Sequence, residues 1–249
     1  MPKFFVSTSR INGNEIIIQN EDVNHIKNVL RAKIKDKIDI CDYKTSKNYL
    51  CEISQIEDNK ILCQIINEKE SGVESNVYLS IFQGLPKADK MELVIQKSVE
   101  LGVYDITPLK MKRCVVKLKE KDEKKKIERW QKISEVAAKQ SGRDIIPSIN
   151  KMKNVNEICS EFDKYDLVLV AYENEKENTL KSELKKIKKE FDSLKIAIII
   201  GPEGGIDENE IQTFKSNGAK IITLGKRILR TETVALNVAS IIMYELEQS

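Results

Sequence analysis

The chain has 249 residues, of which 41% are hydrophobic and 33% charged, enough for one large domain or two small ones. Its five cysteines form no Cys-x-x-Cys pair and it has one histidine. The sequence therefore does not support a zinc ribbon, a His-rich metal site or a Ser-His-Asp triad. We see no signal peptide and no apolar run near the roughly 20 residues that span a bilayer, and therefore expect a cytoplasmic protein with neither metal nor membrane partner.

The net charge of +3 is unevenly distributed along the chain. Residues 1–84 carry a net charge of −1, residues 85–153 carry +8 and residues 154–249 carry −4. A polyanion would bind the basic middle segment. On charge alone, a solvated lysine-rich surface explains the same pattern equally well.

Short apolar stretches separated by turn residues fill the first 72 residues. Strand-like runs are expected at residues 4–6, 15–19, 37–42, 48–56 and 60–67. Only residues 22–30 look helical, with His25 as a half-buried packing residue. The pattern predicts a small β-barrel or sandwich, followed by a polar joint at 71–76.

The middle segment changes to alternating strands and helices. Strands are expected at 77–85 and 106–111, with a helix between them that Gly102 ends. A long helix is expected at 121–140, with Trp130 inward and most lysines outward. The polyanion surface would therefore be mainly one face of this helix.

The last third of the chain contains two glycine-marked turns after buried strands. Strands are expected at 166–172, 196–200 and 219–224, and helices at 179–191, after Asp207, and at 231–247. Asp207 with Glu210 forms a helix-start signature. The last helix is apolar nearly all round, so its own domain or a second subunit must cover it.

The loops at 171–173, 201–205 and 224–232 each follow a buried strand. In open α/β sheets, ligands bind beyond the carboxyl ends of the strands, so these loops are predicted to line one pocket. A Gly-Pro-Glu-Gly turn alone would be an ordinary surface turn. The pair of glycine-marked loops favours a ligand site.

Two runs carry a family resemblance: Ile-Gly-Pro-Glu-Gly-Gly at 200–205 and Leu-Gly-Lys-Arg-Ile-Leu-Arg-Thr-Glu-Thr at 224–233. They resemble SPOUT-class RNA methyltransferases and, within that class, the RsmE family of 16S ribosomal RNA uridine-N3 methyltransferases. Further similar runs lie at 25–31, 96–103 and 137–143, so the resemblance covers nearly the whole chain.

The resemblance implies a fold and a function. The implied fold is α/β, with a PUA-like β-barrel RNA-binding domain at 1–72. A SPOUT methyltransferase domain follows at 77–249, a parallel sheet with helices on both faces and a C-terminal trefoil knot. The implied reaction is S-adenosyl-L-methionine-dependent methylation of N3 of one uridine in 16S ribosomal RNA. The implied partners are that RNA or the small ribosomal subunit, and a second copy of the chain in a homodimer.

The resemblance and the loop positions together give candidate residues. The cofactor would contact Tyr172, Glu173, Ile200, Gly201, Glu203, Gly204, Gly205, Leu224, Gly225, Arg227, Ile228, Leu229, Glu232 and Ala235. RNA would contact Arg10, Arg31, Lys112, Arg113, Lys125, Arg129 and Arg143. Arg10 and Arg230 are the catalytic candidates, as cations that stabilise a uridine anion. Glu203 and Glu232 could equally order their loops through backbone N–H groups.

Two other functions stay open on the sequence. The chain could methylate another RNA position, or act as a non-catalytic RNA-binding ribosome-assembly factor, since residues 201–204 match the bare Gly-x-x-Gly of KH loops. KH loops carry basic residues between the glycines, whereas Pro202 and Glu203 stand here. Rossmann and P-loop signatures are absent from the sequence.

Overall fold

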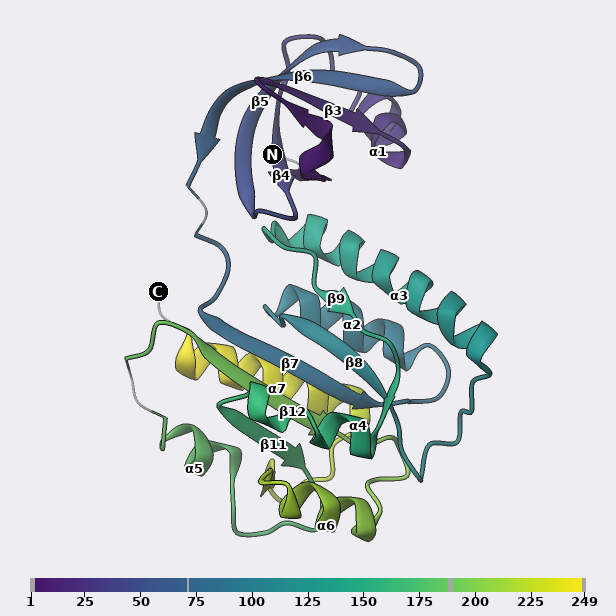
Figure 1. Ribbon diagram of the computed structural model, residues 1–249, viewed down its shortest axis with the longest axis vertical. Coiled ribbons are helices and arrows are strands. Elements are labelled where there is room, and N and C mark those ends of the chain that lie inside the picture. Colours follow the sequence, from purple (N-terminus) through teal and green to yellow (C-terminus); the bar gives the residue numbers. More distant parts are fainter. Residues whose placement is uncertain (1–2, 71, 188–189, 248–249) are drawn as a thin grey trace. The chain divides into compact units, whose positions relative to one another are not determined.

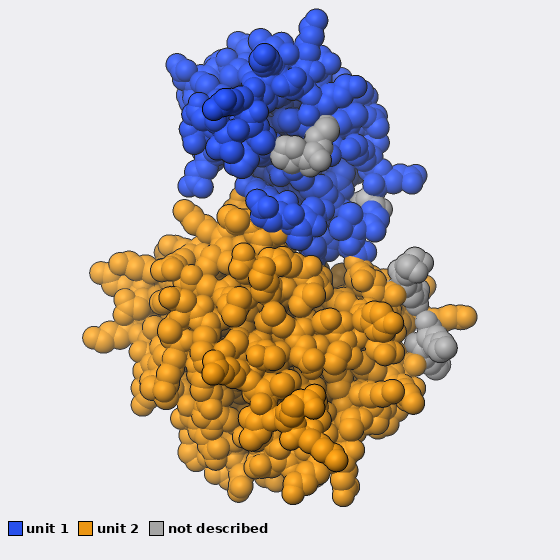
Figure 2. Space-filling model, turned by 180° about the vertical axis from the view of Figure 1, so that it is seen from behind, with its two compact units in different colours: residues 1–74, 138–146 blue, residues 75–137, 147–249 orange. Residues whose placement is uncertain are grey.

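The chain folds into two compact units (Figures 1 and 2). The computed structural model describes residues 3–70, 72–187 and 190–247. Unit 1 comprises residues 1–74 and 138–146, and unit 2 comprises residues 75–137 and 147–249. Residues 138–146 thus belong to the N-terminal unit although they follow more than 60 residues of unit 2 in the chain.

Unit 1 is built on a six-stranded sheet in the order β1-β4-β5-β6-β3-β2. Its strands are β1 (Lys3–Val6), β2 (Ile11–Asn12), β3 (Glu15–Gln19), β4 (Lys37–Asp42), β5 (Lys47–Ile56) and β6 (Lys60–Lys69). β1 pairs with β4 in parallel, and the other pairs are antiparallel. Successive side chains of a strand point to opposite faces of the sheet, so Ile16 and Ile18 of β3 both lie in the core. The five strands predicted from the sequence are confirmed, and β2 was not predicted.

The helix expected at 22–30 is two short pieces, α1 (Glu21–Asn24) and a π-helix, η2 (His25–Val29). A π-helical turn contains more residues than an α-helical turn, so Val29 and Leu30 do not fall on the buried face that the α-helical spacing predicted for them. Both are exposed. His25 is exposed too, with its ring edge-on to Phe4, so the prediction that it is half-buried was wrong.

The segment 138–146 completes unit 1 through polar contacts. The Cys41 thiol donates to the Asp144 carbonyl over 3.1 Å, and the Lys3 ammonium pairs with the Asp144 carboxylate. The Arg143 guanidinium meets the Glu74 carboxylate, with Nη2 2.6 Å from Oε2. These contacts join positions about 70 to 140 apart in the sequence.

Unit 2 contains a parallel sheet of seven strands flanked by helices (Figure 1). The strands are β7 (Val77–Gly84), β8 (Asp105–Lys110), β9 (Ser148–Ile149), β10 (Lys153–Asn154), β11 (Leu167–Ala171), β12 (Leu194–Ile200) and β13 (Lys220–Ile222). Their order is β10-β8-β7-β12-β11-β13, and β9 also pairs with β8. β12 lies between β7 and β11, which explains its unbroken apolar run at 196–200.

The helices of unit 2 begin and end largely at the predicted signals. They are α2 (Lys90–Glu100), α3 (Glu120–Ser141), whose last turn belongs to unit 1, α4 (Val155–Cys159), α5 (Leu180–Leu184), α6 (Glu208–Ser216) and α7 (Thr231–Leu246). α6 has the predicted capping box, in which Asp207 accepts from the Asn209 amide and Glu210 accepts from the Asp207 amide. None of the helices in the described ranges is long and apolar enough to cross a membrane.

The helix expected at 179–191 is wrong beyond Leu184. After α5 the amides of Lys186 and Ile187 bond three residues back, so the chain continues in tight turns. Residues 188–189 lie outside the described part of the chain. β9, β10 and α4 were not predicted.

The C-terminal helix α7 is covered largely by its own unit. It packs on α2, β7 and β12 and buries Val238 and Ile242 completely. One side stays outside this core: Tyr244 is 86% exposed, and Leu236 and Ile241 are half-buried.

Candidate functional site

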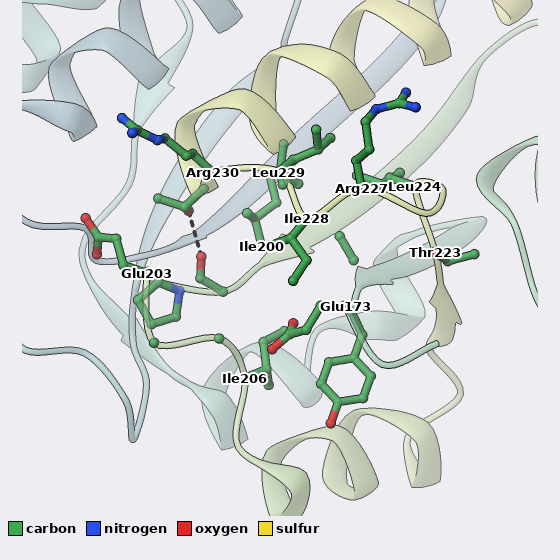
Figure 3. Close-up of a pocket in the computed structure, with 18 of the residues that line it drawn as sticks. Glu173, Ile200, Glu203, Ile206, Thr223, Leu224, Arg227, Ile228, Leu229 and Arg230 are labelled. Atoms are coloured by element: carbon green, nitrogen blue, oxygen red, sulfur yellow. Dashed lines mark hydrogen bonds between the residues drawn. The ribbon is translucent and has the colours of Figure 1, made fainter. Parts of the chain in front are cut away.

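The loops after β11, β12 and β13 line one cavity of about 520 Å³ in unit 2 (Figure 3). These strands are parallel neighbours, so their carboxyl ends meet at one edge of the sheet. The loops therefore converge as the sequence predicts. A cavity of this size lies within the range of about 300–1,000 Å³ that is usual for small-molecule sites.

The cavity contains most of the predicted cofactor residues. It is lined by Tyr172, Glu173, Ile200, Gly201, Glu203, Gly204, Gly205, Leu224, Gly225, Arg227, Ile228 and Leu229, together with Arg230. Glu232 and Ala235 lie outside this lining. Ala235 is fully buried inside α7, and Glu232 reaches Lys90, a lining residue that the sequence did not indicate.

Two glycines of the second loop disfavour a side chain, one because of crowding and the other because of its backbone conformation. A Cβ at Gly201 would lie 2.7 Å from Ile206 Cγ1, inside any normal contact distance. Gly205 has a φ of +71°, and a Cβ there would collide with the Glu173 carboxylate. The loop thus brings bare main chain to the cavity surface, which suits hydrogen bonding to a flat ligand.

A buried hydrogen-bond chain fixes the second loop to the third. The Thr231 hydroxyl donates to the Gly201 carbonyl over 2.7 Å, the dashed line in Figure 3. Fully buried Gln83, at the end of β7, donates through Nε2 to Thr231 Oγ1 over 2.8 Å. These positions were missed, because a threonine at a helix start and a glutamine in an apolar strand are common without any such role.

A charged cluster formed by Lys90, Glu203 and Glu232 lies beside the cavity. Lys90 Nζ is 3.0 Å from Glu203 Oε1 and 3.4 Å from Glu232 Oε2. The hydrogen bond to Glu203 raises the pKa of Lys90. Partial burial opposes ionisation of Glu203, yet amide donors and Lys90 hold the pKa of Glu203 below its usual value. Both groups are charged at neutral pH.

The third loop presents both apolar and cationic side chains. Ile228 is 87% exposed although it lines the cavity, so a ligand there would cover it. Arg227 and Arg230 extend away from the cavity floor in Figure 3, and both are exposed. Their guanidinium groups are thus accessible to an anion at the mouth of the cavity.

The predicted RNA residues Lys112 and Arg113 lie in a loop that contacts the second cavity loop and the start of α6. Arg113 Nη1 donates to the Gly204 carbonyl over 3.2 Å, and Lys112 Nζ is 3.0 Å from Asp207 Oδ2. The hydrogen bond from Lys112 lowers the pKa of Asp207. The side chains of Lys112 and Arg113 are 62% and 44% exposed, so the loop brings positive charge next to the second cavity loop.

On helix α3, Lys125 and Arg129 both line an open groove with α2. The Arg129 side chain is 61% exposed and pairs with Glu92 over 2.8 Å. The Glu92 carboxylate therefore offsets part of the positive charge of α3.

The predicted RNA residues of unit 1 differ in their accessibility. The Arg10 guanidinium donates to the Gln19 side chain, and Arg31 is exposed in a left-handed conformation with φ of 51°. Arg143 is only 4% exposed and bonded to Glu74, so its predicted place on an RNA surface is wrong. Its guanidinium holds residues 138–146 to Glu74 instead.

No group of His, Cys, Asp and Glu side chains that could hold a metal ion occurs within the described ranges 3–70, 72–187 and 190–247. The five cysteines are buried and free. Burial raises the pKa of Cys41, Cys51 and Cys63 to about 12, so these thiols are poor ligands and nucleophiles.

Family models match both parts of the chain. An RNA methyltransferase domain matches residues 73–243, and an RNA methyltransferase PUA domain matches residues 18–66. The first match covers the strands, the cavity loops and nearly all of α7.

Full-length relatives agree with these matches. The chain is 34% identical to ribosomal RNA small subunit methyltransferase E of Bacillus subtilis, over 99% of this chain and 98% of that protein. It is 35% identical to the protein of that name from Mesomycoplasma hyopneumoniae, over 95% and 96%.

Solved structures show the same fold. A ribosomal RNA small subunit methyltransferase E from Neisseria gonorrhoeae, bound to S-adenosyl methionine, superposes with a TM-score of 0.86 at 30% identity, covering 98% of this chain and 97% of that one. A Legionella pneumophila protein in complex with the cofactor SAM gives a TM-score of 0.84 at 28% identity, covering 97% and 96%. The chain therefore belongs to the ribosomal RNA small subunit methyltransferase E family of RNA methyltransferases.

Proposed function

We propose that this chain transfers the methyl group of S-adenosyl-L-methionine to N3 of one uridine in the 16S RNA of the small ribosomal subunit. The observation that carries the proposal is the cavity, where three loops from neighbouring parallel strands present bare main chain and apolar side chains. The Neisseria relative, which is bound to S-adenosyl methionine, supports the same cofactor here.

The cavity residues fit this cofactor chemically. Main-chain groups at Gly201 and Gly205 would bind its polar edges, and Ile200, Ile228 and Leu229 would cover its apolar surface. When bound, the cofactor supplies a methyl group on a sulfonium, which is a good leaving group. The protein's task is then to hold the RNA base in line and to manage its N3 proton.

Cationic side chains would favour loss of that proton. A uridine that loses the N3 proton carries negative charge on O2 and O4, and a guanidinium nearby stabilises it. Arg230, at the mouth of the cavity, and Arg10, from unit 1, are proposed for this role. Glu203 and Glu232 are less suited as proton acceptors, because Lys90 already pairs with both.

The finer architecture is also proposed from the family resemblance. We propose a PUA-like RNA-binding domain at 1–72 and a SPOUT domain at 77–249, whose C-terminal loops form a trefoil knot. We propose a homodimer that acts in the cytoplasm, where ribosomal subunits assemble. In it, Arg31, Lys112, Arg113, Lys125 and Arg129 would contact RNA together with Arg10.

The proposed reaction has a direct test. We expect calorimetric titration to give micromolar affinity for S-adenosyl-L-methionine, and the purified protein to methylate N3 of a single uridine in small subunits from a strain that lacks it. Methylation at another atom would show that the proposed position, N3 of uridine, is wrong. Failure to bind the cofactor at millimolar concentration would instead favour a non-catalytic RNA-binding factor.

RNA affinity should fall steeply with salt, because phosphate contacts release counterions. Reversing Lys125 and Arg129 to Glu should reduce the slope of log affinity against log salt by about one per lost contact. Lys125 should contribute more, since Arg129 is already paired with Glu92. Lys220→Glu is the control, because Lys220 is exposed at the start of β13 and lies outside α3. Equal slopes for all variants would show that α3 is only a solvated surface.

Association of two chains should depend on the exposed side of α7. Tyr244→Glu should weaken the dimer and leave the fold intact, because Tyr244 is 86% exposed. Ile242, the residue that sequence reasoning would choose for this test, is fully buried in its own unit, so a charge there would unfold the chain. Sedimentation at micromolar concentration measures the effect, and a fully active wild-type monomer would contradict the dimer.

A further inference from the structure

The charged cluster of Lys90, Glu203 and Glu232 has an unbalanced charge. It places two carboxylates around one ammonium, and the three side chains come from the start of α2, the second cavity loop and the first turn of α7. The carboxylate side chains are 24% and 14% exposed, and the lysine side chain is 31% exposed. An excess negative charge is therefore held in a partly desolvated place beside the cavity.

Lys90 and Glu232 are less exposed to water than the other charged residues around the cavity. Glu173, Glu203, Lys226, Arg227 and Arg230 are exposed, and Figure 3 shows Glu203 and the two arginines extending away from the other side chains of the lining. Solvent and salt screen such groups strongly, whereas partly buried charges are screened less. Lys90 and Glu232 are thus the least screened charges beside the cavity, and the contact between Lys90 and Glu203 joins them to its second loop.

We propose that the charged cluster selects the cationic cofactor over its neutral product, S-adenosylhomocysteine. This inference rests on the proposed function. The two molecules share the adenine, the ribose and the amino-acid group, and they differ in the methyl group and the positive charge on sulfur. Contacts to the shared groups bind both equally, so a preference for the cofactor over the product requires an element that responds to the methyl group or to that charge. Glu203 and Glu232 supply it, and Lys90 limits its strength.

The proposal predicts opposite effects from neutralising the two signs of charge. Lys90→Met removes the ammonium and keeps most of the stem, so the excess negative charge grows and the preference for the cationic cofactor should rise. Glu232→Gln and Glu203→Gln should lower it. The glutamine carbonyl at position 203 can still accept the Lys87 amide that now bonds to Glu203.

The experiment measures dissociation constants of both ligands by calorimetry on the full chain. The ratio of the product's constant to the cofactor's constant should rise at least about threefold in Lys90→Met and fall by a similar factor in Glu232→Gln. The ratio cancels damage that affects both ligands alike. Lys87→Met, whose side chain is exposed at the neighbouring turn, is the control and should leave the ratio unchanged.

The outcomes separate this inference from the proposed function. If each variant weakens both ligands by one common factor, the charged cluster only ties the loops together and the inference is wrong. A ratio that moves in the same direction for Lys90→Met and Glu232→Gln overturns it too. If Lys90→Met does not fold, the two glutamine variants decide by the same criterion. A wild-type chain that binds neither ligand would overturn the proposed function itself.

Discussion

Gly201→Val is expected to weaken binding of S-adenosyl-L-methionine at least about 100-fold, which corresponds to about 2.7 kcal/mol. The added Cβ would lie 2.7 Å from Ile206 Cγ1 and 3.2 Å from the Gly205 carbonyl carbon, so the loop must move away from both. Overpacking of this kind costs about 1–3 kcal/mol of stability, which a domain of this size can bear. The chain should therefore stay folded while the cavity changes shape.

Two further glycines make this experiment specific. Gly225 has a φ of +113° with no heavy atom within 4 Å of its added Cβ, so Gly225→Val should disturb the third loop through backbone strain rather than crowding. Gly218, at the end of α6 and outside the cavity lining, has a φ of +96° in equally open space. Gly218→Ala should cost about 1 kcal/mol of stability and no affinity. A folded Gly201→Val protein with wild-type affinity would show that the cofactor binds elsewhere.

Arg143→Met should destabilise unit 1 by about 2–4 kcal/mol, measured by urea unfolding. The substitution leaves the Glu74 carboxylate without the guanidinium that now bonds to both of its oxygens. The cost stays below that of a fully buried pair, because the Glu74 side chain is 23% exposed. Arg143→Lys should recover only part of the stability, since an ammonium cannot pair with both oxygens in the same planar geometry.

The matched control for this variant is Arg31→Met. Arg31 is exposed in the same unit, so its loss should change stability by less than about 0.5 kcal/mol and should lower RNA affinity if it contacts phosphate. If Arg143→Met is instead stable and deficient only in RNA binding, Arg143 is an RNA-binding residue.

The parallel sheet and its cavity could be predicted because their signals are local. Charge-free runs such as 196–200 mark strands buried on both faces, and glycine marks the turns that follow them. β9, β10 and α4 escaped prediction because elements of two to five residues give no periodicity. The π-helix at His25–Val29 has a period that neither the α nor the β pattern represents.

The missed site residues share a different cause. Gln83 and Thr231 are 148 positions apart, and Lys90 meets Glu203 and Glu232 only after the sheet has brought three loops together. Arg143 was misplaced for the same reason, since its partner Glu74 is 69 positions away. A sequence pattern shows that a side chain is charged, and the fold decides whether that charge faces water or a partly buried carboxylate.

The assignment of residues 138–146 to unit 1 has a consequence for how the protein is made. A ribosome synthesises roughly 70 further residues after Glu74 before this segment is complete, which takes on the order of 4–14 s at typical rates of synthesis. During that interval Glu74 lacks Arg143, Cys41 lacks the Asp144 carbonyl and Lys3 lacks the Asp144 carboxylate. Residues 75–137 of unit 2 must therefore be synthesised before these polar groups of unit 1 find their partners, so a fragment ending near residue 74 would be an incomplete folding unit.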